Sequence, residues 1–200
     1  MPLLLLLAFL AAPPAAGVGR ATRVIPRADL LRGKSTLPLK EQDGVAENDR
    51  IRTQASGRAR VVLNDGSILT IGASSLLAVR SAAEGTRAGS LELRYGRVRA
   101  FVTARTASQG AFEVRTSTAV LGVLGTTLFV DAAQDLTRVA NLSDEPDARV
   151  RVTSTDPRAP GEVILLPGQG TSVPVRRPPE PPRKWTLEEV QAAKSDTDIP

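Results

Sequence analysis

The sequence predicts an all-β protein that ends in one short helix. Many short runs alternate apolar and charged residues with the period of two that a strand with one buried face requires. Gly, Pro, Asn and Asp punctuate these runs at short intervals, as they do in turns. No convincing helical pattern occurs before residue 185. The spacing of the runs fits a sandwich, a barrel or a solenoid, so the pattern itself leaves the architecture open.

Composition limits the chemistry that the chain can perform. Its 200 residues allow one domain with short appendages. It contains no Cys and no His, which excludes disulfides, thiolate metal sites and Ser-His or Cys-His catalysis. The 26 basic and 21 acidic residues leave a formal charge of +5, a weak guide to partners. We expect no cofactor, no metal and no enzymatic activity.

The first residues have the pattern of an export signal. Residues 1–19 carry no charged side chain, and Leu3–Ala12 is an apolar run of signal-peptide length, too short to span a bilayer. Small residues then offer a cleavage site after Ala16 or Gly17. We therefore predict a signal peptide at 1–17, a periplasmic or secreted protein and no integral membrane span after cleavage, with an uncleaved anchor or a misassigned start as alternatives.

The first half of the chain then predicts paired strands. Residues 20–46 read as short strands and turns. The runs 59–63 and 68–71 flank Asn64-Asp65-Gly66, whose residues accept the positive φ of a tight turn, so we predict an antiparallel hairpin. A second pair follows at 91–95 and 98–102, with Gly96 as the turn or bulge and Tyr95 on the inward side with Leu91 and Leu93.

The stretch 112–130 is the predicted centre of the core. It opens with strand alternation at Phe112 and becomes almost wholly apolar after Ala119, so we expect both of its faces to be covered. Gly122 and Gly125 within it indicate a bulge, a bend or a close approach of backbone. Further strands are predicted at 136–142, 148–152 and 163–166.

The C-terminal part differs in composition. Residues 174–182, PVRRPPEPP, predict an extended, semi-rigid linker that ends the domain. Thr186 and Glu189 then form a capping box, with Trp185 and Val190 as a hydrophobic staple, and predict a helix from Leu187 to about Lys194. Trp185 either docks this helix on the sheet or serves as an exposed anchor for a partner.

Residues 112–130, FEVRTSTAVLGVLGTTLFV, resemble the signature segment of FecR-like domains. Three further segments, 49–71, 90–102 and 165–171, are similar to the family's flanking segments in the same order, so the resemblance covers about 45–175. The chain departs from the signature where Ser117 replaces a common Pro, Leu124 a common Arg and Thr127 a common Glu. The loss of both charges weakens any transfer of a binding role to this loop.

The resemblance implies an architecture and a function. It implies a twisted, solenoid-like stack of short antiparallel strands over 20–175, followed by the linker and helix at 176–200. It also implies a non-catalytic, exported interaction module that acts as a cell-envelope sensor, scaffold or signalling-associated protein. No cytoplasmic helical segment or membrane helix precedes the domain, so we expect no direct control of a sigma factor. The expected partner is an envelope protein or a glycan.

Each residue set that suggests chemistry also has a structural explanation, which we prefer. Asn64 and Asp65 lack the acidic ladder of a calcium loop and fit a turn. Gly122, Gly125 and Thr126 lack the Lys and the following helix of a phosphate loop. Glu92 and Glu113 alternate outward with arginines, so we interpret them as cross-strand partners of arginine rather than the paired carboxylates of a glycan-acting enzyme.

Outward arginines form the remaining candidate surface. They could make a basic face for an envelope polyanion or polysaccharide, although a solvated mixed face is the simpler interpretation. We expect no nucleic-acid partner, because the chain is predicted to be exported and has only one Trp, one Tyr and four Phe. The outward arginines are Arg58, Arg60, Arg94, Arg97, Arg99, Arg149 and Arg151. The candidate binding residues are Trp185, Arg97, Arg99, Arg149 and Arg151.

Overall fold

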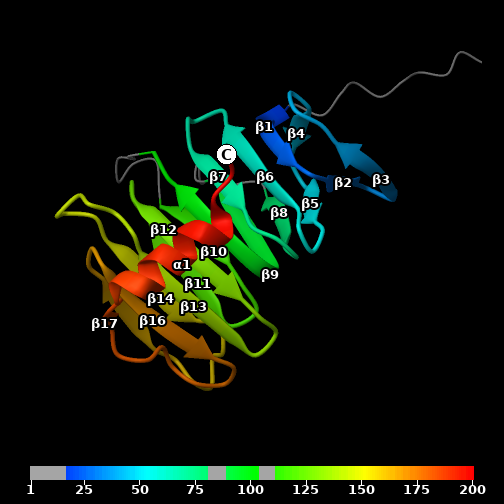
Figure 1. The fold of residues 1–200 in the computed structure, drawn as a ribbon. Helices are drawn as coiled ribbons and strands as arrows, with labels where there is room; N and C mark the ends of the chain where they lie inside the picture. The colour runs from blue at the N-terminus through cyan, green and yellow to red at the C-terminus, as the bar shows by residue number, and fades with distance from the viewer. Residues whose placement is uncertain (1–16, 81–88, 104–110) are drawn as a thin grey trace, which may run out of the picture.

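The structure, a computed structural model, describes residues 17–80, 89–103 and 111–200. The predicted signal peptide falls, except for Gly17, outside these residues and stays a prediction. The described chain is mostly β, with one helix near its C-terminal end, as the sequence predicts (Figure 1).

The strands form two sheets, and the chain passes between them after every one or two strands. In order, they are β1 (Gly17–Ile25), β2 (Ala28–Arg32), β3 (Ser35–Leu39), β4 (Gly44–Ala46), β5 (Arg50–Thr53), β6 (Arg58–Leu63), β7 (Ile68–Ile71), β8 (Leu76–Arg80), β9 (Ser90–Phe101), β10 (Phe112–Arg115), β11 (Ala119–Val123), β12 (Thr127–Ala132), β13 (Leu136–Asn141), β14 (Val150–Ser154), β15 (Glu162–Leu165), β16 (Gln169–Pro174) and β17 (Arg183–Lys184). The helix α1 spans Leu187–Thr197.

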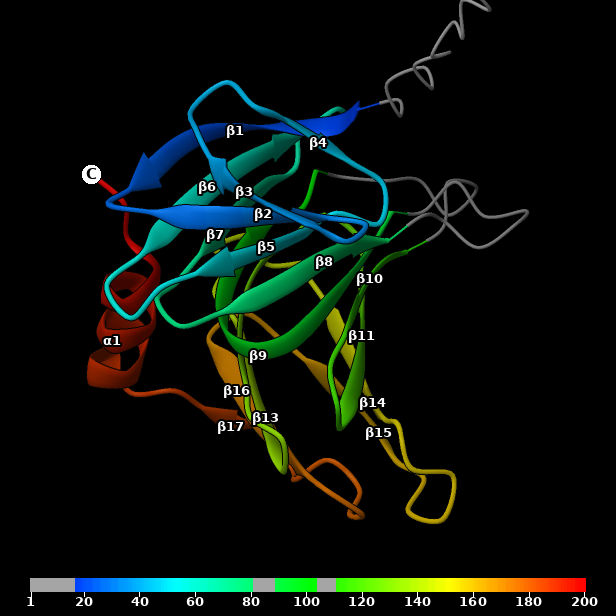
Figure 2. The same cartoon turned by 90° about the vertical axis from the view of Figure 1, so that its right-hand side faces the viewer.

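Sheet A runs in the order β4-β1-β6-β7-β9-β12-β13-β16-β17. Sheet B runs in the order β3-β2-β5-β8-β9-β10-β11-β14-β15. All pairs are antiparallel except β9 with β10. The view in Figure 2 shows β14 and β15 on one side of the molecule and α1 on the other. Neither sheet closes on itself, so each has two edges.

Strand β9 is common to both sheets. Its first half pairs in sheet B and its second half in sheet A, and Gly96, with φ +91°, lies at the change. A bulge in the pairing with β8 precedes it, and it turns Tyr95 outward to 43% exposure. The prediction of an inward Tyr95 was therefore wrong, and the two predicted strands around Gly96 are one strand with a bulge.

One hydrophobic core lies between the sheets. Both sheets supply fully buried large side chains: Ile51, Leu77, Leu91, Leu93, Phe112, Leu121 and Leu165 from sheet B, and Leu69, Ile71 and Leu128 from sheet A. Leu91, Leu93 and Phe112 are inward members of the predicted alternating runs, so the period of two correctly predicted the buried side at these positions. The strand β8, which supplies Leu77, was not predicted from the sequence. A second, small cluster of Phe129, Ala140 and Ala193 joins α1 to the outer face of sheet A.

The predicted central stretch supplies three strands. β10, β11 and β12 are separated by turns, and Gly125 adopts φ +90° in the second turn. Phe112, Leu121 and Leu128 are fully buried, which places this stretch in the core. The expectation that both faces are covered was wrong for β11, because its outer side carries Gly122 and leads to Leu124 at 53% exposure.

Two local predictions are confirmed. The hairpin of β6 and β7 closes through Asn64-Asp65-Gly66, where Gly66 has φ +84° and the Ser67 amide donates to Asp65 Oδ1 at 2.9 Å. Helix α1 begins after a capping box, since the Glu189 amide donates to the Thr186 hydroxyl and the Thr186 amide donates to the Glu189 carboxylate. The helix extends one turn beyond the predicted end.

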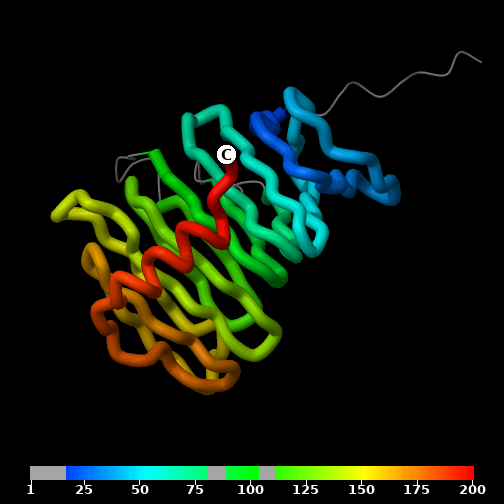
Figure 3. Tube along the Cα trace, in the orientation of Figure 1, coloured from blue at the N-terminus to red at the C-terminus, as the bar shows by residue number. Residues whose placement is uncertain are grey.

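The proline-rich segment 174–182 packs against the sheets. The Glu180 amide donates to the Ser172 carbonyl at 2.9 Å, and the Thr171 hydroxyl donates to the Glu180 carbonyl at 2.6 Å. Pro179 is buried. These bonds tie the segment to β16 and carry the chain to α1, which crosses the outside of sheet A (Figure 3). The solenoid winding implied by the resemblance stays a prediction.

Candidate functional site

Trp185 docks on the outer face of sheet A. Its ring meets Phe129 edge-on, with ring centroids 6.0 Å apart, and both belong to the small cluster that contains Ala193 of α1. Gly170 on β16 leaves room for the indole, because a Cβ there would fall on its Nε1 and Cδ1 atoms. Of the two roles left open for Trp185, the structure therefore supports docking of the helix.

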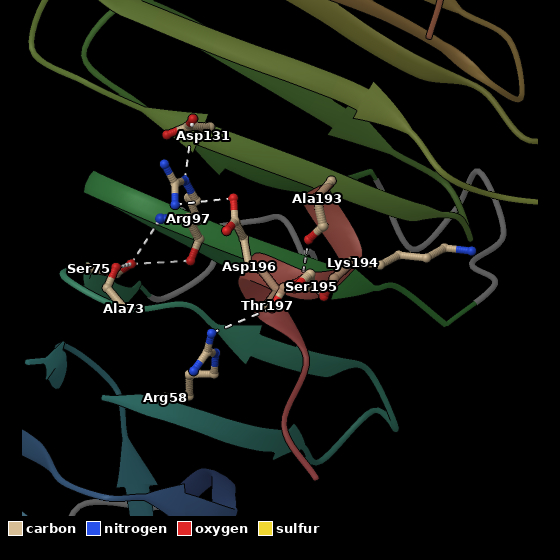
Figure 4. A network of polar contacts seen from close by, with 10 residues as sticks. All are labelled: Arg58, Ala73, Ser75, Arg97, Asp131, Ala193, Lys194, Ser195, Asp196 and Thr197. Carbon is tan, nitrogen blue, oxygen red and sulfur yellow. Dashed lines mark hydrogen bonds and ion pairs between the residues drawn. The ribbon is translucent and has the colours of Figure 1, made fainter. Parts of the chain in front are cut away.

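Arg97 and Arg99 lie on β9 beneath the C-terminal end of α1. Arg97 contacts Asp196 at 3.1 Å and Asp131 at 3.5 Å (Figure 4). Arg99 contacts Asp198 at 3.6 Å. The Arg97 amide donates to the Ser75 hydroxyl at 2.9 Å, which fixes β9 at this point. The two arginines are thus covered by the chain itself.

The seven outward arginines do not form one continuous face. Arg58, Arg60, Arg97 and Arg99 lie on sheet A near α1, whereas Arg149 and Arg151 lie at β14 of sheet B. Arg94 is paired with Glu92 at 2.9 Å. Among the described residues, the seven arginines therefore form no single basic face that spans both sheets.

Arg149 and Arg151 line a shallow groove of about 330 Å³ on the outer face of sheet B. Gly122 forms part of its floor, and a Cβ there would meet only the Arg151 Cβ at 3.8 Å and the Ala111 Cβ at 3.9 Å. The exposed side chains of Leu124 and Ile164 border it. The groove therefore offers apolar contact area beside two arginines, and the carboxylates of Glu113 and Glu162 also line it.

The edge strand β15 lies alongside this groove. It pairs with β14 on one side and with no strand on the other within the described residues. The Ser154 amide donates to the Gly161 carbonyl, and hydrogen-bonded pairs recur at every second residue of an antiparallel ladder. Val163 and Leu165 therefore bond to β14, while the backbone groups of Glu162 and Ile164 face the open side.

The other three sheet edges are less suited to binding a strand. Edge β4 has three residues and edge β17 has two. Edge β3 contains Pro38, which has no amide proton to donate. Short edges and prolines block the addition of further strands. The edge of β15, with Ile164 at 41% and Leu166 at 42% exposure, is the best-formed candidate site.

The carboxylates singled out for chemistry are held by arginines. Glu92 contacts Arg80 at 2.5 Å as well as Arg94, and Glu113 contacts Arg115 at 2.7 Å. Gly122 lies within β11 and Gly125 in the turn before β12, and neither is followed by a helix that could hold a phosphate. Among residues 17–80, 89–103 and 111–200 no three acidic side chains group as metal ligands would.

Two further carboxylates are buried, and sequence reasoning did not single them out. Asp29 accepts hydrogen bonds from Arg52 and Gln54, and its contact with Arg52 lowers the pKa of the carboxyl. Asp49 accepts a bidentate pair from Arg32 and the Ala46 amide at 2.7 Å. Both are fully partnered, so we assign them to stability rather than to catalysis.

Residues 49–144 match the family model described as FecR protein. The chain carries a FecR domain. Two crystal structures of a candidate anti-sigma factor from Parabacteroides distasonis, at 1.65 and 2.50 Å resolution, share its fold, with TM-scores of 0.58 and 0.57 at 20% identity. The similarity covers 72% of this chain and 63% and 62% of those chains, so it spans less than two thirds of their length. No curated protein matches.

The matched residues of the FecR domain run from β5 to the end of β13. The β15 edge and helix α1 both lie outside the matched residues. Strand β15 joins sheet B through β14, and α1 covers strands β9 and β12 of sheet A from outside. No helix in the described parts of the chain is long and apolar enough to span a membrane. Sequence reasoning identified the arginines but missed Ile164, Asp196 and Asp198, whose roles depend on strand order.

Proposed function

We propose that this protein is an exported, non-catalytic FecR-domain interaction module of the cell envelope, which binds an envelope protein as a sensor, scaffold or signalling component. The FecR domain and its fold neighbours support a role in signalling. The module comprises residues 20–175 with solenoid-like winding, and it acts in the periplasm or outside the cell once residues 1–17 are removed.

The open edge of β15 carries this proposal. It offers unpaired backbone groups at Glu162 and Ile164 and an apolar border formed by Leu124 and Ile164. A partner strand that pairs there gains main-chain hydrogen bonds, and its alternate side chains enter the groove over Gly122. This mode needs no catalytic residue and no cofactor.

The test is a crosslinking pull-down from the cell envelope with the full chain and two proline variants. Ile164→Pro removes an amide from the open side of β15 and leaves the bonds to β14. Thr36→Pro is the matched control, because Thr36 lies two residues from Pro38 on edge β3 and shares its orientation. We expect one envelope protein to be recovered with the parent chain and with Thr36→Pro, and to be lost with Ile164→Pro.

Two results would contradict the proposal. Equal recovery with Ile164→Pro would exclude the β15 edge as the binding site. Retention of polysaccharide in place of protein, weakening steeply with added salt, would favour the alternative of an envelope polyanion or polysaccharide binding protein. Arg149 and Arg151 in the groove are the observation that keeps this second candidate. N-terminal sequencing of the fractionated protein tests export.

A further inference from the structure

A second surface lies on the opposite sheet, beneath the last residues of the chain. Five arginines from three strands point out of sheet A there and contact residues 195–200. The Arg58 guanidinium donates to the Ser195 carbonyl at 3.5 Å, Arg60 to the Ile199 carbonyl at 3.0 Å and Arg23 to a Pro200 oxygen at 3.0 Å. Arg97 and Arg99 add the ion pairs with Asp196 and Asp198.

Residues 196–199 place acidic and buried side chains in alternation. Asp196 and Asp198 reach arginines, whereas Thr197 is fully buried and Ile199 is 3% exposed. Asp198 ends the helix in an extended conformation, with φ −71° and ψ 141°. The arginine surface therefore holds a short acidic segment with a buried apolar residue after the second Asp.

This segment does not fill the surface that it occupies. A cavity of about 280 Å³ opens beside it, lined by Arg60, Ile68, Thr70, Arg99, Phe101 and Thr127. Phe101 is 49% exposed there. This open cavity indicates room for a ligand larger than residues 195–200.

The contacts that hold residues 195–200 are also weak individually. The side chains of Arg97 and Asp196 are 43% and 41% exposed. In the second ion pair, between Arg99 and Asp198, the Asp198 side chain is 71% exposed. Water therefore screens both ion pairs. Only Ala193 and Thr197 of α1 are buried. Displacement of residues 195–200 therefore exposes Thr197 and Ile199, but otherwise breaks contacts that are mostly open to water.

We propose that the arginine surface of strands β1, β6 and β9 binds an extended acidic segment of a partner protein, and that residues 195–200 occupy it in competition. The partner segment carries two acidic residues spaced as Asp196 and Asp198 are, followed by a large apolar side chain that enters the cavity beside Phe101. This proposal is independent of the β15 edge, which lies on the other sheet.

The test uses a labelled peptide, Asp-Thr-Asp-Ile-Pro-Leu-Phe, and the full chain. We expect the variant Asp196→Asn/Asp198→Asn, whose own segment competes poorly, to bind the peptide about tenfold more tightly than the parent chain. Adding Arg60→Gln and Arg99→Gln to this variant should abolish the gain. The matched control adds Arg149→Gln and Arg151→Gln, on sheet B, to the same Asp196→Asn/Asp198→Asn variant. This control should keep the tighter binding of the peptide. A peptide with both Asp replaced by Asn should bind no variant.

Hydrogen exchange gives a second measurement that needs no variant. Peptide added to the parent chain should increase amide exchange over residues 187–197 and leave β14 and β15 unchanged. Equal affinity of parent and Asp196→Asn/Asp198→Asn, or binding that leaves exchange of α1 unchanged, would overturn the proposal. Binding of dextran sulfate to the arginines without binding of the peptide would overturn it as well, since it would show a general polyanion surface.

Discussion

The outer faces of the two sheets have similar strands but different surroundings. On sheet A, the chain returns as α1 and covers Phe129, Arg97 and Arg99. On sheet B, the corresponding face around Gly122 and Ile164 stays open. Strands on both sheets alternate arginines with buried aliphatic residues. The comparison shows that the alternation of apolar and polar residues determines which face of a strand is buried in the core. Whether the outer face is covered depends on segments far along the chain.

The largest expected effect is at Gly96, where β9 passes from one sheet to the other. Its φ of +91° is unfavourable for a side chain, and a Cβ there would lie 2.5 Å from the Ser75 Cα. We expect Gly96→Ala to lower the free energy of unfolding by roughly 3 kcal/mol, measured by urea titration.

Gly33→Ala is the matched control for this substitution. Gly33 also has a positive φ, +57°, but a Cβ there meets no atom within 4 Å. The control should lose only about 1 kcal/mol, because it carries the backbone strain without the clash. Equal losses in both variants would show that contact with Ser75 does not fix the path of β9.

The second effect separates the covered face from the open face. Gly170→Ala places a methyl group on the Trp185 indole, so it should undock α1 and cost about 2 kcal/mol. Gly122→Ala meets nothing closer than 3.8 Å and should change stability by less than about 0.5 kcal/mol. Trp185 is the only Trp, so its fluorescence should shift to the red in the first variant alone. A shift in both, or in neither, would contradict the docked arrangement.

The third effect is the pH dependence of the stability of α1. Sheet B has no helix on its outer face and therefore no corresponding effect among the described residues. The hydrogen bond from Arg183, and then the Thr186 amide, lower the pKa of Glu189 from 4.5 to about 2. The stabilisation is therefore fully present above pH 4.5 and decreases as the pH falls through about 2. Amide exchange of α1 should follow this decrease, and Glu189→Gln should remove it. A midpoint near 4.5 would show that neither Arg183 nor the Thr186 amide holds the Glu189 carboxylate.

The smallest effect compares one arginine from each face. Arg97→Gln loses exposed ion pairs to Asp131 and Asp196, so we expect about 0.5 kcal/mol less protection of α1 in hydrogen exchange. Arg151→Gln, which loses a 3.7 Å contact with Glu162, should leave α1 unchanged. An equal response of α1 to the two variants would mean that Arg97 does not hold the helix.

Local patterns predicted much of the fold. The hairpin at Asn64-Asp65-Gly66, the start of α1 at Thr186 and the inward side chains of most strands follow from turn chemistry, capping and alternation, which act between near neighbours. Tyr95 was misplaced because the bulge beside it shifts the alternation by one residue. The stretch 112–130 was assigned too much burial because apolar content alone does not reveal what covers a strand.

The sequence by itself determined the strand-rich fold, the capped helix and the FecR signature, since each depends on residues close together in the chain. Only the tertiary structure decided which strands are edges, which glycines accommodate Trp185, and that Asp196 and Asp198 return to arginines about a hundred residues earlier. Strand order sets these contacts, and strand order arises from packing of the whole core. The two candidate surfaces therefore became visible only in three dimensions.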